Sequence, residues 1–179
     1  GKFGGMYMNE EFFQFCQYCF TQQEVNVKFI ILSTSDHQAL WTQIEERKLP
    51  KQAFWINKVS KQEVPSYLSA ADFGFCGVRP IPSQRYSSPI KDGEYWACGL
   101  PVIIPRGISD DHLFAQEHNL GILIEELDNQ HLEKTVQKVI EWQRKENAEE
   151  VRKRCRNFVQ KDRNVDTYKQ LYANIFEQL

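Results

Sequence analysis

The sequence lacks any long hydrophobic run and any excess of charge of one sign. No apolar stretch in its 179 residues approaches the roughly 20 residues that a transmembrane helix needs. The formal net charge of −2 argues against a protein whose whole surface binds nucleic acid or an anionic membrane. We therefore expect a protein with no nucleic-acid partner and no membrane span of its own.

Cysteine is present, but without the even number or regular spacing of a disulfide framework. Five cysteines fit a reducing compartment, so the cytoplasm is the expected location. Cys16 and Cys19 form a C-x-x-C motif among aromatic residues, and no second pair completes a metal site, so we expect them in the core. The four histidines also lack metal-ligand spacing. We expect no protein-bound metal and no cofactor.

Internal repeats, low-complexity segments and a signal peptide are lacking as well. The chain opens at Gly1 rather than at a methionine, which is typical of a piece of a longer protein. With 41% hydrophobic and 26% charged residues, the composition is that of an ordinary globular domain. We expect a single domain, with an α/β core over 1–125 and a helical tail over 129–179.

Strand-like and helix-like hydrophobic patterns alternate along the first two thirds of the chain. The expected strands are 27–33, 52–56, 73–78, 100–104 and 120–124. The expected helices are 9–22, 36–47, 62–71, 89–98 and 108–118, followed in the tail by 129–145, 148–161 and 165–179, with Asn9, Ser88 and Ser109 as caps. Strands separated by helices need right-handed crossovers. We therefore predict an α/β, Rossmann-like three-layer domain with a parallel sheet.

The segment 88–103 carries most of the functional information, because it pairs a capped helix with a buried strand. Ser88 is a good N-cap and Pro89 suits the first helical position. The free N–H groups and positive dipole end of this helix favour an anion, usually phosphate. Lys91 and Glu94 are neighbours on one face, and they offer a cation and a carboxylate that accepts two hydroxyl hydrogen bonds. This pattern is typical of a nucleotide-sugar site.

Two loops are candidates to complete that site. Gly4 and Gly5 either relieve a tight turn or present backbone amides to a diphosphate. The segment 78–87 follows an expected strand, beyond whose carboxyl end open α/β sheets bind ligands. This segment is either a loop that contacts a donor sugar or a plain connection.

These motifs resemble the donor-binding domain of glycosyltransferase family 4 and its relatives, which are retaining enzymes of the GT-B fold. The segment 64–75, with Ala71 and Asp72, resembles the family's l-x-x-A-D helix and strand, and 1–7 resembles its glycine-rich loop. The resemblance runs from residue 1 to about residue 123, and more weakly through the helical tail. It implies the C-terminal half of a GT-B fold, a nucleoside-diphosphate sugar as donor substrate, and an N-terminal acceptor domain that is absent from this chain.

The resemblance also implies roles for single residues. Glu94 would accept the ribose 2′ and 3′ hydroxyls, and Lys91 and Lys2 would lie near the phosphates. The segment 33–35 and Val59 would hold the base. The expected donor site therefore consists of Lys2, Gly4, Gly5, Ser33, Val59, Ser88, Pro89, Ile90, Lys91 and Glu94, of which Lys91 and Glu94 are the expected catalytic residues.

The chain departs from the family pattern at two places. Many members have a glutamate eight positions before the one that matches Glu94, where this chain has Tyr86, and we interpret this as a variant grip on the donor sugar. The glycine-rich loop also lacks the family's second lysine. Arg79 and Arg85 either supply that charge or are solvated loop residues.

The resemblance predicts the nucleotide-sugar-binding domain of a retaining glycosyltransferase, which moves a sugar from a carrier such as UDP to an acceptor hydroxyl, as in polysaccharide biosynthesis. Its partner would be the acceptor domain of the same protein, through which the whole could associate peripherally with the inner face of a membrane. Because the last helix of such folds crosses back to that domain, we expect an apolar stripe to be partly exposed; it consists of Tyr168, Leu171, Tyr172, Ile175 and Phe176. The alternatives are half of a nucleotide-sugar epimerase and a non-catalytic nucleotide-binding domain.

Overall fold

The computed structural model describes residues 3–22 and 25–177, apart from the side chains of Thr167, Gln170 and Leu171. The strands are β1 (Phe29–Leu32), β2 (Phe54–Asn57), β3 (Gly74–Phe75), β4 (Val102–Pro105) and β5 (Gly121–Ile124). The helices are α1 (Asn9–Thr21), α2 (His37–Glu46), α3 (Val64–Ser69), α4 (Ile90–Ala97), α5 (Asp111–Glu117), α6 (Asn129–Lys145), α7 (Ala148–Asp162) and α8 (Val165–Phe176), with 3-10 turns η1 (Lys51–Ala53) and η2 (Pro82–Tyr86).

All the strand pairs are parallel, as the alternation of strands and helices predicts. β1 pairs with β2, and β3, β4 and β5 form a second hydrogen-bonded group in that order. Side-chain packing joins the two groups, because the ring of Phe12 on α1 lies 6.0 Å from that of Phe29 on β1 and 5.3 Å from that of Phe75 on β3. The predicted Rossmann-like α/β fold is confirmed.

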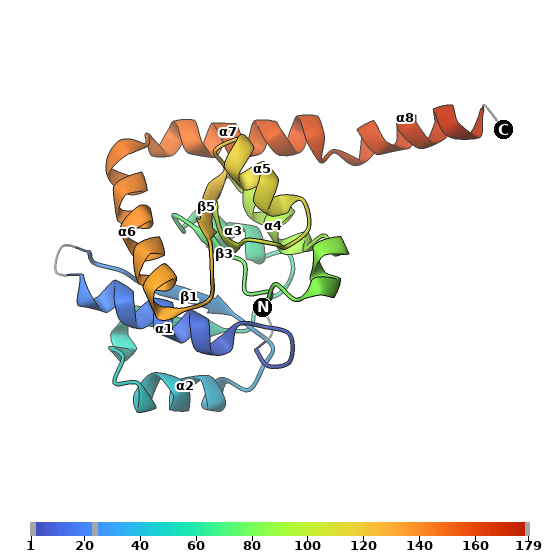
Figure 1. Cartoon of the computed structure of the whole chain (residues 1–179). Coiled ribbons are helices and arrows are strands. Elements are labelled where there is room, and N and C mark those ends of the chain that lie inside the picture. The colour runs from blue at the N-terminus through green and yellow to red at the C-terminus, as the bar shows by residue number, and fades with distance from the viewer. Residues whose placement is uncertain (1–2, 23–24, 178–179) are drawn as a thin grey trace.

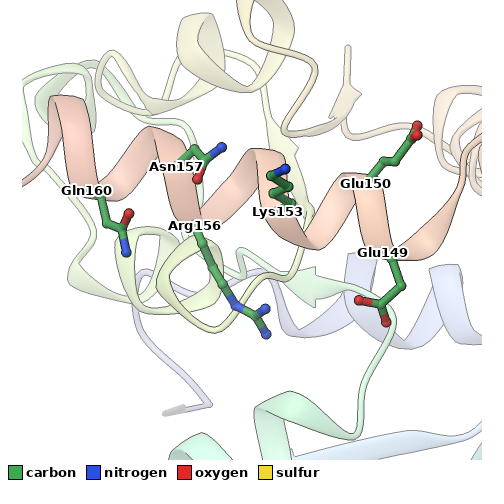
Figure 2. Close-up of a pocket in the computed structure, with 6 residues that line it drawn as sticks. All are labelled: Glu149, Glu150, Lys153, Arg156, Asn157 and Gln160. Carbon is green, nitrogen blue, oxygen red and sulfur yellow. The ribbon is translucent and has the colours of Figure 1, made fainter.

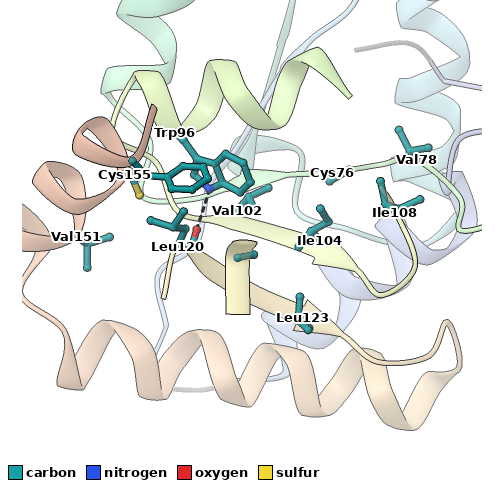
Figure 3. Packing of buried hydrophobic residues seen from close by; sticks show 12 residues of the cluster. Cys76, Val78, Trp96, Val102, Ile104, Ile108, Leu120, Leu123, Val151 and Cys155 are labelled. Atoms are coloured by element: carbon teal, nitrogen blue, oxygen red, sulfur yellow. Dashed lines mark hydrogen bonds between the residues drawn. The ribbon is translucent and has the colours of Figure 1, made fainter. Parts of the chain in front are cut away.

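Trp96 on α4 is at the centre of one part of the core (Figure 3). Its side chain is fully buried, and its Nε1 donates a hydrogen bond to the backbone oxygen of Leu120 at 3.0 Å. Its ring meets that of Phe158 on α7 edge to face, with centroids 5.3 Å apart. Trp96 therefore connects α4 to the segment before β5 by a hydrogen bond and to α7 by ring packing.

The tail wraps around this core and then leaves it (Figure 1). α6 packs against α1 and β5, and α7 packs against α4. α8 continues beyond α7 and projects from the body of the domain (Figure 1). Its exposed apolar side chains are Val165, Tyr168, Tyr172, Ile175 and Phe176. The predicted exposure is confirmed for the four residues of the stripe whose side chains are described; Leu171 lies outside that description.

The paired cysteines Cys16 and Cys19 lie where the sequence predicts them. All five cysteines are free, and Cys16 and Cys19 are buried in the core, as predicted. Burial raises the pKa of Cys19 to about 12. Among the described residues, no helix combines the length and apolar character needed to cross a membrane.

The three predicted helix caps are wrong, because other residues occupy the N-cap positions. Asn9 lies inside α1, and its Oδ1 accepts a hydrogen bond from the backbone N–H of Gly4 at 3.1 Å. Ser109 has a φ of 47° and precedes α5, which begins three residues later than predicted, although its Oγ accepts a hydrogen bond from the N–H of Asp111. Ser88 is the third case and belongs to the candidate site. The segment 78–87 also contains η2 rather than loop alone.

Candidate functional site

The carboxyl ends of the parallel strands place several predicted residues at one edge of the domain. Leu32 ends β1 opposite Asn57, the last residue of β2, so Ser33 and Val59 both follow at that edge. Ser33 is buried, and its Oγ accepts a hydrogen bond from the N–H of Ser35 at 3.0 Å. Val59 is half-buried. This edge is where open α/β sheets bind ligands.

The glycine-rich loop lies at the same edge and is tied to two strands. The N–H of Phe3 donates to the Oγ of Ser35, beyond β1, at 3.0 Å. Tyr7 forms an isolated antiparallel bridge with Val78, beyond β3. Gly4 and Gly5 have φ values of 96° and 62°, which explains the need for glycine at both positions. One amide is already engaged, since the N–H of Gly4 bonds to Asn9.

Helix α4 begins one residue later than predicted, and Ser88 does not cap it. Pro89 occupies the N-cap position with an extended backbone (φ −63°, ψ 114°), and no side chain in the described part of the chain caps the helix. The Oγ of Ser88 instead accepts a hydrogen bond from Nη2 of Arg163 at 2.5 Å. Ile90, the first residue of the helix, is 78% exposed. The start of α4 is therefore open to solvent and free of a side-chain cap.

Lys91 joins this helix to the glycine-rich loop. Its Nζ lies 4.9 Å from the centroid of the Tyr7 ring, which is a cation–π distance. Glu94 is exposed one turn further along the same helix. The structure thus brings the loop 3–7 and the start of α4 together, as the sequence predicts. Lys2 lies outside the described residues.

The two loop arginines differ in their surroundings. Nη2 of Arg79 lies 2.8 Å from a carboxylate oxygen of Glu11, which is buried on α1. Arg79 is therefore held in an ion pair with Glu11, although its side chain is still 39% exposed. Arg85 is exposed on η2, and so is Tyr86, which stands where the family has a glutamate and is 86% exposed.

A pair of buried carboxyl groups behind α4 was missed by the sequence analysis. Asp92 is fully buried, and neither of its carboxyl oxygens has a well-oriented hydrogen-bond partner in the described part of the chain, although the thiol of Cys76 faces it. Burial, helped by the charge of Asp111, raises the pKa of Asp92 to about 7. The available signal was the spacing of Asp92 and Trp96, because residues four apart share one helix face.

Asp111 faces Arg163 in the same buried region. Nη1 of Arg163 lies 2.9 Å from Oδ1 of Asp111, at the distance of an ion pair but without the direction of a hydrogen bond. Burial raises the pKa of Asp111, against the opposing effect of the guanidinium group. Both carboxyl groups therefore hold their protons more tightly in the folded chain than in the unfolded one.

The free energy of unfolding should fall as the pH rises from about 5 to 8, and Asp92 should cause much of that fall. Its pKa is about 7 in the folded chain, and an unfolded aspartate titrates near 3.9, so the folded state binds the proton more tightly and loses stability on ionisation. Asp92→Asn should stabilise the protein by about 2–3 kcal/mol more at pH 8 than at pH 5. Urea unfolding at both pH values measures this difference.

The matched control is Asp72→Asn, because Asp72 is exposed and its substitution should leave the pH dependence unchanged. Equal effects of Asp92→Asn at pH 5 and pH 8 would contradict the prediction.

Two other features of the surface carry no assigned ligand. Glu126, Asp128 and His131 bring one potential metal-ligand atom each within 4.8 Å of one another, and the sequence spacing did not reveal this group. Asp128 already caps α6 through the N–H of His131 and contacts its ring at 2.8 Å. An open hollow of about 440 Å³ runs along α7 (Figure 2) and is lined by Glu149, Glu150, Lys153, Arg156, Asn157 and Gln160.

Comparison with known proteins supports the sequence resemblance over most of the chain. Residues 21–171 match the family model "Glucosyltransferase 3-like, C-terminal domain". The match extends through the tail as far as residue 171, and it leaves out the glycine-rich loop. No curated protein matches the chain.

Among solved structures, the chain is similar to WaaG, a glycosyltransferase involved in lipopolysaccharide biosynthesis. The TM-score is 0.70 and the sequence identity 14%, over 88% of this chain and 40% of the WaaG chain. At this identity the likeness concerns the fold, and the chain spans 40% of the length of that protein. The family model, in contrast, matches the sequence itself from the last residue of α1 into α8. The chain therefore belongs to the glucosyltransferase 3-like family, as a glycosyltransferase C-terminal domain.

Proposed function

We propose that this domain binds the nucleoside-diphosphate sugar of a retaining glycosyltransferase, with the diphosphate between the glycine-rich loop and the start of α4. The contact between Lys91 and Tyr7 carries this proposal, because it places a cation between the two segments. The start of α4 contributes backbone N–H groups that no side chain caps. Backbone donors and a cation at one place suit a phosphate group.

Lys91 can leave the Tyr7 ring when a phosphate arrives. A cation–π contact near the surface contributes about 0.5–1 kcal/mol, whereas a hydrogen bond to a charged group contributes about 1.5–3 kcal/mol. The phosphate is therefore the preferred partner of Lys91. Before a nucleotide binds, the Tyr7 ring keeps the ammonium group close to the proposed phosphate site.

The proposed chemistry is electrostatic stabilisation of the leaving diphosphate. Negative charge develops on the diphosphate as the bond to the sugar breaks, and the helix dipole and Lys91 would stabilise it without a protein nucleophile. Glu94 would accept hydrogen bonds from the two ribose hydroxyls, and Ser33 and Val59 would lie beside the base. The acceptor hydroxyl would come from a second domain.

The exposed face of α8 supports the existence of that second domain. Tyr168, Tyr172, Ile175 and Phe176 are between 47% and 71% exposed on one projecting helix, which is unusual for large apolar side chains in a helix without a partner. We infer that the acceptor domain of the same protein covers them.

Substitution of Glu94 tests the donor site. Glu94→Ala should weaken nucleotide binding by about 1–3 kcal/mol, because two ribose hydroxyls lose their charged acceptor; this is roughly a 5- to 150-fold rise in Kd. Calorimetric titration with UDP, GDP and their sugars measures the effect, and titration in EDTA should give the same Kd because no carboxylate-held metal takes part.

Glu133→Ala is the matched control, because Glu133 is an exposed helix glutamate on α6. The donor-site proposal fails if the unmodified chain binds none of these nucleotides at millimolar concentration. A strict requirement for magnesium or manganese would remove the helix-terminus mechanism.

A further inference from the structure

We propose that Arg163 is a positioning residue that holds the start of α4 in place for the diphosphate. This inference rests on the proposed function of α4, but it concerns a residue far from that helix in sequence. Arg163 follows α7 directly, and Ser88 lies 75 residues earlier. The helical tail therefore reaches back to the segment that presents the site.

The guanidinium group of Arg163 contacts three parts of the domain at once. Its Nη2 donates to the Oγ of Ser88 at 2.5 Å, just before α4. Its Nη1 lies 2.9 Å from Asp111 at the start of α5, and its central carbon lies 5.4 Å from the centroid of the Trp96 ring. The Arg163 side chain is only 19% exposed and the Asp111 side chain 1% exposed, so solvent screens this pair weakly.

The start of α4 needs an external anchor because its own sequence supplies none. Pro89 has no N–H group, and no side chain caps the helix. A methyl group added at Gly93 would lie 3.5 Å from Nη1, so the guanidinium group lies beside the first turn. Arg163 thus packs on the helix backbone and holds the residue before it.

The planar fork of arginine is required for this combination. Its Nη1 lies at ion-pair distance from Asp111 while its Nη2 donates a hydrogen bond to Ser88, and its flat face can stack on Trp96. A lysine could reach one of these groups but not all three. We do not expect Arg163 to contact the nucleotide sugar itself. It acts through Ser88 and the backbone of α4.

Three variants test the inference in otherwise unmodified protein. Arg163→Gln removes the fork and its charge, Arg163→Lys keeps the charge alone, and Ser88→Ala removes the contact to the segment before α4 while leaving the pair with Asp111. We expect Arg163→Gln to raise the Kd for whichever of UDP and GDP binds by about tenfold. Ser88→Ala should raise it in the same direction, and Arg163→Lys should restore only part of the affinity.

Amide hydrogen exchange in the absence of nucleotide provides a second readout. Residues 90–93 should exchange faster in Arg163→Gln than in the unmodified protein, at a temperature where both are fully folded. Arg154→Gln is the matched control, because Arg154 also lies on the tail and pairs with Glu146 away from α4; it should change neither Kd nor exchange at 90–93.

The outcomes separate this inference from the proposed function. If the unmodified protein binds neither UDP nor GDP, the proposed function fails, and faster exchange at 90–93 in Arg163→Gln still supports the anchor. If the unmodified protein binds a nucleotide and Arg163→Gln binds it equally well, the positioning role is overturned, whatever happens to stability.

Discussion

Sugar transfer by this chain alone should be at least about 10³-fold slower than by a longer chain that includes an acceptor domain. A bound and oriented acceptor is worth an effective concentration on the order of 10⁵ M or more, and it must lie within about 3–3.5 Å of the anomeric carbon. The described structure spans 40% of the WaaG chain, to which its fold is similar. The apolar face of α8 also remains uncovered.

Transfer to an acceptor and hydrolysis of the donor should both be measured, for this chain and for the longer one. Glu94→Ala in the longer chain is the control, because it should lower activity there while both domains remain present. Transfer by the short chain at the rate of the longer one would place the acceptor site within these 179 residues, and the two-domain proposal would have to be abandoned.

Trp96→Ala should destabilise the domain by about 3–5 kcal/mol, which is a large part of the stability of most domains. The Trp96 side chain is fully buried, so its removal leaves a cavity between α4 and α7. It also removes the hydrogen bond that the backbone oxygen of Leu120 accepts. Urea unfolding measures the loss through the free energy of unfolding.

Two further substitutions calibrate the effect of Trp96→Ala. Trp96→Phe keeps most of the ring packing and should cost about half as much. Trp55→Ala should cost clearly less than Trp96→Ala, because Trp55 is 40% exposed and stacks on Tyr67 at the surface. A loss below about 1 kcal/mol for Trp96→Ala would show that α4 does not depend on this contact.

The parallel architecture was predictable from local patterns. Expected strands of five to seven residues alternate with amphipathic helices, and this alternation admits few arrangements. The helix predicted over 89–98 also ends just before Gly99, whose φ of 83° is the left-handed conformation in which glycine ends helices. Such features depend on neighbours in the sequence, which is why the sequence alone reveals them.

Two side chains, those of Ser88 and Arg79, have partners that are distant in sequence. Ser88 has the residue type of a cap, but Arg163, 75 residues later, accounts for its hydroxyl group. Arg79 pairs with Glu11, 68 residues earlier. Local propensity carries no information about such contacts, because either residue would satisfy its polar groups equally well in water.

The candidate site shows both situations. The sequence independently predicted Lys91 and the glycine-rich loop as phosphate contacts, and the structure shows that Lys91 contacts Tyr7 of that loop. Their role toward a phosphate stays a prediction. The burial of Asp92 was not predictable in the same way, since aspartate is a common residue in the first turn of an exposed helix. The four-residue spacing from Trp96 indicates that Asp92 is buried only once Trp96 is known to face the core.

The distribution of the thiol groups makes the domain easy to observe. Cys16, Cys19, Cys76 and Cys155 are buried, whereas Cys98 is half-buried just after α4. Thiol-directed labels react with accessible groups far faster than with groups inside a core. A fluorophore on Cys98 would therefore lie at the opposite end of α4 from Ser88. The natural sequence thus offers a spectroscopic handle on the helix that is proposed to bind the donor, with no cysteine to add and none to remove.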